Sequence, residues 1–90
     1  MPGTVSFQIV YRKPAQKALV KMPRSLAERF LAAFERIAGG MDTTALDIKL
    51  LKGREGYRLR IGEWRAIYRV EAGRLMIEVV DIGPRGDVYK

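Results

Sequence analysis

The chain contains no cysteine and no histidine. Without cysteine there can be no disulfide, no cysteine-based zinc finger and no thiol catalysis, and this composition fits a reducing compartment. Without histidine, a ribonuclease that works through a pair of imidazoles is excluded. The ten acidic residues are scattered along the chain and mostly interleaved with basic ones. We therefore expect no metal centre and no cofactor.

Long apolar segments are also missing. No apolar run approaches the roughly 20 residues that a membrane-spanning helix needs. The N-terminal residues Met1–Thr4 lack the charged and then apolar pattern of a signal peptide. Glycine-rich phosphate loops, Ser-His-Asp sets and dinucleotide fingerprints are absent as well. The sequence therefore predicts a soluble, cytoplasmic protein with no membrane partner.

Positive charge is what the sequence has in excess. Its 90 residues include 17 Lys and Arg against 10 Asp and Glu, a formal charge of +7, and the length suits a single domain spanning residues 1–90. Residues 49–69 hold seven basic and two acidic residues, and residues 12–24 hold five basic and no acidic ones. This imbalance predicts a polyanionic partner, or an acidic protein that masks the basic surface.

Hydrophobic periodicity predicts an α+β fold with the order β-α-α-β-β-β. Alternation predicts a first strand carrying Val5, Phe7, Ile9 and Tyr11. Apolar residues at helical spacing predict two helices, from Pro14 to Met22 and from a Ser25–Glu28 capping box to the Gly39–Gly40 pair. Residues 41–55 are interpreted as a connecting segment, and strands follow at Tyr57–Ile61, Trp64–Val70 and Leu75–Ile82. We expect the N-terminal strand and a helical hairpin with basic outer positions to pack on one face of a small antiparallel sheet.

The Gly62-Glu63 pair predicts a two-residue type II′ hairpin turn, which sets the pairing of the strands on either side. Arg60 then lies opposite Arg65, and Arg58 shares their side of the sheet, away from the helices. Like charges directly across a sheet repel each other, so such a face is either solvated or used to hold an anion. The fork of a guanidinium matches two phosphate oxygens, which favours anion binding. Glu78 is the acid that could neutralise part of this face.

The chain resembles the RelE/ParE toxin superfamily over nearly its whole length. The resemblance is carried by the ordered segments Phe7–Tyr11, Ala15–Leu19 with Met22-Pro23, Leu51–Gly53, Gly56–Gly62, Trp64–Arg69, Ile82–Arg85 and Val88-Tyr89. It implies a toxin of a type II toxin–antitoxin system. RelE-like members enter the ribosome and cleave mRNA without a metal ion, whereas ParE-like members poison DNA gyrase.

The resemblance implies five catalytic residues: Arg58, Arg60, Arg65, Arg85 and Tyr89. In the family the cations orient the phosphate and stabilise the transition state, and the tyrosine is the candidate general base. Because all five positions are occupied, a nuclease is favoured; a gyrase inhibitor and a catalytically inactive antitoxin-binding domain remain the alternatives. The implied partners are an acidic antitoxin in a hetero-oligomeric complex, the ribosome and mRNA. Three further cations, Lys49, Lys52 and Arg54, are candidates for steering or for contacts with ribosomal RNA.

Two departures from the family pattern affect proton transfer. The pair on the second strand is often lysine, whereas here both are arginine, which does not exchange protons near neutral pH. Pro84 stands where many relatives carry His or Lys. Tyr89, with an ordinary pKa of about 10, would need neighbouring arginines to lower that pKa before it could act as a base. Alternatively, Tyr89 simply packs a terminal strand. The other aromatic residues, Trp64, Tyr57 and Tyr68, are predicted to lie in the core.

Overall fold

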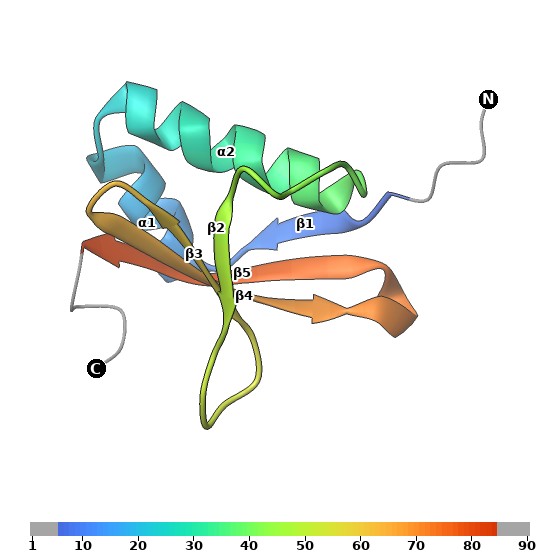
Figure 1. Ribbon diagram of the computed structural model, residues 1–90. Helices are drawn as coiled ribbons and strands as arrows, with labels where there is room; N and C mark the ends of the chain where they lie inside the picture. The colour runs from blue at the N-terminus through green and yellow to red at the C-terminus, as the bar shows by residue number, and fades with distance from the viewer. Residues whose placement is uncertain (1–5, 85–90) are drawn as a thin grey trace.

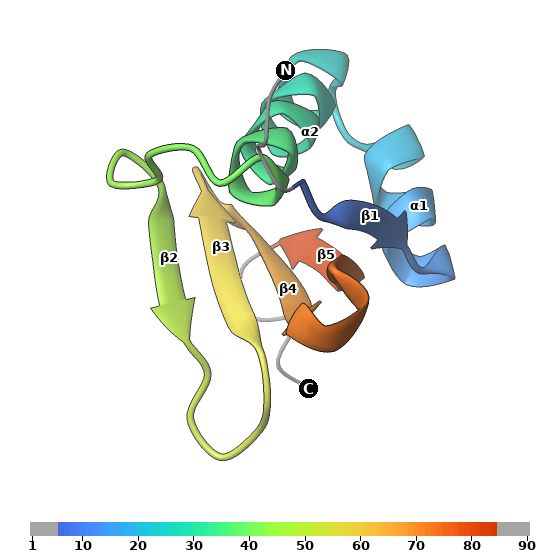
Figure 2. The same cartoon turned by 90° about the vertical axis from the view of Figure 1, so that its right-hand side faces the viewer.

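Two α-helices lie across one side of a five-stranded sheet, as the computed structural model of residues 6–84 shows (Figures 1 and 2). Within those residues the other side of the sheet carries no α-helix. The elements in chain order are β1 (Gln8–Tyr11), α1 (Lys13–Lys21), α2 (Arg24–Ala38), β2 (Asp47–Leu50), β3 (Tyr57–Ile61), β4 (Trp64–Glu71), the 3₁₀ turn η1 (Ala72–Arg74) and β5 (Met76–Pro84).

The predicted α+β fold class is confirmed, but the sheet differs from the prediction in two respects. Its strand order is β1-β5-β4-β3-β2, and β1 runs parallel to β5, so the sheet is mixed rather than wholly antiparallel. Hydrophobic alternation gives a strand its faces but says nothing about the direction of its partner, so the sequence pattern could not reveal this pairing.

The second difference is β2, a strand inside the segment that was interpreted as a connection. It pairs antiparallel with β3 at the edge of the sheet. It is only four residues long, and its apolar residues do not share one environment, because Leu50 is 69% exposed whereas Ile48 packs against the core. Its sequence, Asp47-Ile48-Lys49-Leu50, does alternate polar and apolar residues, but a run of only four residues at a sheet edge was too short to be distinguished from a connection.

A proline lies at the start of each helix of the hairpin. Pro14 occupies the first turn of α1, and Pro23 is the N-cap residue of α2. Because α2 begins at Arg24, Ser25 lies inside its first turn, and the cap makes no side-chain hydrogen bond. The predicted Ser25–Glu28 capping box is therefore wrong, although the predicted helix and its end before Gly39 are confirmed.

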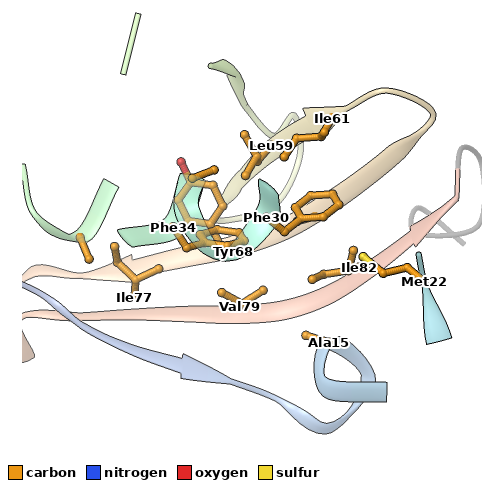
Figure 3. Packing of buried hydrophobic residues seen from close by; sticks show 13 residues of the cluster. Ala15, Met22, Phe30, Phe34, Leu59, Ile61, Tyr68, Ile77, Val79 and Ile82 are labelled. Carbon is orange, nitrogen blue, oxygen red and sulfur yellow. The ribbon is translucent and has the colours of Figure 1, made fainter. Parts of the chain in front are cut away.

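The core lies between the helices and the sheet (Figure 3). Phe30 and Phe34 of α2 are fully buried, and the Phe34 ring meets the Tyr68 ring edge-on at 5.3 Å between centroids. Leu59 of β3 and Val79 of β5 complete the buried layer beneath them. Every second residue of β3 and β4 thus faces the helices, and the residues between them face the open side.

A bulge in β5 decides which of its last residues enter the core. Tyr68 of β4 pairs with Val79, but Ile67 pairs with Asp81, so one extra residue sits in β5 at this point. Strict alternation after Val79 would have turned Asp81 toward the helices. With the bulge, Ile82 enters the core instead and is 4% exposed. The bulge therefore keeps a carboxylate out of the apolar layer.

None of the helices within residues 6–84 combines the length and apolar character needed to cross a membrane.

Gly56 ends the loop before β3, and its substitution tests how this strand is positioned. It has a φ of +123°, and an added Cβ would lie 2.9 Å from the Tyr68 carbonyl oxygen. We expect Gly56→Ala to lower the free energy of unfolding by about 1–3 kcal/mol, measured by urea denaturation. Gly73→Ala is the matched control, because nothing lies within 4 Å of its Cβ and no positive φ is required. Equal stability of both variants and the original protein would contradict this account.

Candidate nucleic-acid interface

The turn at Gly62-Glu63 sets the register of β3 and β4. The structure pairs Ile61 with Trp64 and Arg60 with Arg65, as the sequence predicted. Gly62 has a φ of +60°, a conformation that favours glycine and begins a type II′ turn. Arg60 and Arg65 therefore lie directly opposite each other, and pairs of this kind bring Cβ atoms to about 4.5–5.5 Å.

Alternation places Arg58, Arg60 and Arg65 on the side of the sheet turned away from the helices. Their neighbours Leu59 and Ala66 are fully buried on the helix side. We call the open side of β2, β3 and β4 the arginine face. Its other members on these strands, by the same alternation, are Asp47, Lys49, Ile67, Arg69 and Glu71.

Arg58 is held by an acid that the sequence analysis did not connect with it. Its Nη2 lies 2.8 Å from Oδ1 of Asp47, and its side chain is only 13% exposed. Asp47 belongs to β2, the strand missed from the sequence, so the repulsion on this face has a compensation that was not foreseen. The arrangement is a cation cluster with one tethered member.

Arg60 and Arg65 differ in their surroundings. Arg60 is exposed, and its Nε donates a hydrogen bond of 3.2 Å to the carbonyl oxygen of Gly62. Arg65 is half-buried and lies across from Gly83 on its other side, in β5.

Glu78 lies on the same side of the sheet as the arginines and neutralises part of that side, as the sequence suggested, through Arg69 of β4. Its carboxylate lies 2.7 Å from Nη1 of Arg12 and 3.1 Å from Nη2 of Arg69, and its side chain is 11% exposed. The angle to Arg69 is too poor for a hydrogen bond, so that contact is an ion pair only. Glu78 thus cross-links β1, β4 and β5 and does not pair with Arg58 or Arg60 among the described residues.

The remaining predicted site residues are dispersed. Lys49 lies opposite Arg58 on β2 and is exposed on the arginine face. Lys52 and Arg54 sit in the exposed loop between β2 and β3, at the end of the sheet. Arg85 and Tyr89 lie outside the described residues. The structure therefore brings together Arg58, Arg60, Arg65 and Lys49, and separates Lys52 and Arg54 from them along the sheet.

Two tyrosines on the helix side are unsuited to proton transfer. Burial raises the pKa of Tyr68 to about 12, and burial together with the Glu35 carboxylate raises the pKa of Tyr11 to about 12. Tyr57 stacks on Tyr68 with ring centroids 5.4 Å apart, and Trp64 packs against the core. The prediction that Trp64, Tyr57 and Tyr68 belong to the core is confirmed.

A basic groove was missed from the sequence. It has a volume of about 710 Å³ and runs between α2 and the neighbouring ends of β2 and β3. Arg29 and Arg36 line it from α2, and Arg60 lines it from β3. The apolar part of its lining is Ala32, Ala33, Ala45, Leu46 and Ile61. The signal was present, because Arg29 and Arg36 are seven residues apart and so share one helix face with small residues between them.

No group of three or more acidic side chains that could hold a metal ion occurs within residues 6–84.

The fold is that of the RelE toxins. The archaeal RelE–RelB complex from Pyrococcus horikoshii is similar with 29% identity and a TM-score of 0.73, over 91% of this chain and 98% of that one. The RelB–RelE complex from Methanococcus jannaschii has 24% identity and a TM-score of 0.74, covering 90% and 95%. The isolated E. coli RelE toxin has 18% identity and a TM-score of 0.72, covering 93% and 92%.

The sequence matches, over residues 9–89, the family described as ParE toxin of type II toxin-antitoxin system, parDE. The chain therefore belongs to the ParE toxin family, within the RelE/ParE superfamily, as the resemblance indicated. By family and fold it is a toxin of a type II toxin–antitoxin system. No curated protein matches the sequence significantly.

The raised tyrosine pKa values predict loss of stability in alkali. In the folded protein Tyr68 keeps its proton up to about pH 12, whereas an unfolded tyrosine loses it near 10. The stability from the neutral phenol is thus fully present below pH 10 and is lost as the pH rises toward 12. We expect Tm to fall between pH 10 and pH 12, and to fall less in Tyr68→Phe. An identical fall in both proteins would show that Tyr68 does not couple to folding.

Proposed function

We propose that this toxin is a metal-independent, ribosome-dependent mRNA endonuclease that inhibits translation. The observation that carries the proposal is the cross-strand pairing of Arg60 with Arg65, next to Arg58, on a sheet face without a covering α-helix in residues 6–84. Guanidinium groups so arranged suit a phosphodiester, since each can contact two phosphate oxygens. The superfamily membership and the RelE fold support the same function.

The chemistry requires a base, cations and protonation of the leaving group. The 2′-hydroxyl gives its proton to a base, the 2′-oxygen bonds to phosphorus, and the bond to the 5′-oxygen breaks as that oxygen takes a proton from water. Negative charge builds up on the phosphorane, where Arg60, Arg65 and the proposed Arg85 stabilise it. We propose Tyr89 as the base and assign Lys49, Lys52 and Arg54 to steering of RNA.

We propose that cleavage depends on the ribosome because the free protein has few groups that could transfer a proton. Arginines do not exchange protons near neutral pH, and Tyr11 and Tyr68 have pKa values of about 12. A mRNA held by the ribosome would present its 2′-hydroxyl in a fixed orientation, which can replace part of the missing catalysis. We therefore expect weak or no cleavage of free RNA.

Mapping of mRNA 5′ ends after induction in cells tests the activity. We expect cuts at codon boundaries of translated messages, and we expect Arg65→Ala or Arg85→Ala to lower the rate by about 10²-fold while the fold is retained, because each removes a cation from the phosphorane. Arg24→Ala is the control, since its side chain is 93% exposed on α2 and it makes the same change in charge. Unchanged toxicity in both site variants would contradict the proposed site.

Inhibition of DNA gyrase is the second candidate, because the matched family is that of ParE toxins. Such an activity keeps the fold but needs none of the five proposed catalytic residues. Induction of the DNA-damage response with intact messages would favour it over mRNA cleavage in the same experiment.

We propose an acidic antitoxin as the partner, bound in part along the basic groove. RelB–RelE complexes are known for the relatives from Pyrococcus horikoshii and Methanococcus jannaschii. Three arginines and one acid, Asp47, line the groove together with small and apolar residues, and this lining of net positive charge suits an acidic amphipathic helix. Because Arg60 lines the groove and also belongs to the arginine face, an occupant there would compete with RNA for Arg60.

Charge reversal in the groove tests this partner surface. We expect Arg29→Glu and Arg36→Glu to weaken binding of the proposed acidic antitoxin by tenfold or more, measured by calorimetry, because each replaces a cation with an anion facing the ligand. Arg24→Glu is the control on the same helix, outside the groove lining. Equal weakening by all three variants would indicate a general charge effect and not the groove.

A further inference from the structure

Arg58 is restrained on the arginine face by an ion pair and by burial. One of its terminal nitrogens is bound to Asp47 at 2.8 Å, and its Nε is buried without a hydrogen-bond partner. A ligand can therefore reach only the outer end of the guanidinium. An arginine in solution would instead offer all five of its donors.

The backbone register explains how Asp47 reaches Arg58. Asp47 lies directly across from Arg60 on β2, but its carboxylate contacts the next arginine along β3. On the other side of Arg58, the side chain of Ile67 stands opposite on β4 and is 1% exposed. Arg58 thus lies between Ile67 on β4 and the edge strand, where Lys49 stands directly opposite it and Asp47 diagonally from it.

The ion pair has two opposite electrostatic effects on a phosphate ligand. It fixes the orientation of the guanidinium, which favours a defined contact with one phosphate. It also cancels one positive charge, which weakens general attraction to an RNA backbone. Since Asp47 is 47% exposed, solvent ions can reach its carboxylate. The residue can also be substituted without loss of core packing.

We propose that Asp47 is a positioning residue that withholds the charge of Arg58 from non-specific RNA binding and holds its guanidinium oriented for the reacting phosphate. This inference rests on the proposed nuclease function for its second half and on the geometry of the ion pair for its first. Asp47 itself does not contact the substrate. It lowers affinity for RNA in general and raises the rate at the correct phosphate.

The first experiment measures binding of the full-length protein to a non-cleavable single-stranded 2′-O-methyl RNA by fluorescence anisotropy over a range of salt concentrations. Releasing one cation for a phosphate contact steepens the slope of log K against log salt by about 0.7. We expect this for Asp47→Asn, and we expect no further change when Asp47→Asn is added to Arg58→Ala. Glu28→Gln, which removes an exposed carboxylate on α2, should leave the slope unchanged.

The second experiment measures single-turnover cleavage of ribosome-bound mRNA. We expect Asp47→Asn to lower the rate at saturation by about tenfold, and Asp47→Glu to restore part of it, because the loss is one of orientation. An unchanged salt slope, or a slope change that persists in the Arg58→Ala background, overturns the charge-withholding claim. An unchanged saturating rate in an active enzyme overturns the positioning claim.

The two arms also separate failure of the inference from failure of the proposed function. If the original protein does not cut ribosome-bound mRNA, the nuclease proposal and the orientation claim fall together. The binding arm still decides whether Asp47 withholds the charge of Arg58, because it needs no cleavage.

Discussion

Repulsion between arginines on one sheet face is the physical constraint that the other contacts of this surface must offset. A two-residue turn holds Arg60 and Arg65 directly across from each other, with no freedom to change the pairing. Two contacts offset this repulsion: Asp47 forms an ion pair with Arg58, and the backbone carbonyl of Gly62 accepts a hydrogen bond from Arg60. A face with these compensations is stable in the free protein and still presents cations to an anionic ligand.

The edge strand β2 connects the two basic surfaces of the molecule. It supplies Asp47, which tethers Arg58 on the arginine face and also lines the groove beside α2. Arg60 likewise belongs to both surfaces. A short strand at the sheet edge is therefore the point at which the proposed binding of a partner along α2 and the proposed binding of RNA on the arginine face can influence each other.

Membership of the ParE toxin family and the fold of the RelE toxins leave the target open between DNA gyrase and translated mRNA. The arginine face favours RNA, because a cluster of guanidiniums on a sheet face has a direct use in stabilising a phosphorane. The core contributes to the arginine face only indirectly. Fully buried Phe30 and Phe34 hold α2 against the sheet, and the bulge in β5 keeps Asp81 out of that core.

Local sequence rules were sufficient for the elements whose signals lie within a few residues. The Gly62-Glu63 turn determined its own register, and proline and glycine marked the helix ends, because these residues restrict the backbone directly. The parallel pairing of β1 with β5, the strand β2 and the contact of Asp47 with Arg58 were decided only in the tertiary structure. Each depends on segments that are remote along the chain, or on a run of four residues whose alternation was too short to distinguish a strand from a connection. The cations were therefore readable from the sequence, whereas the acid that restrains one of them was not.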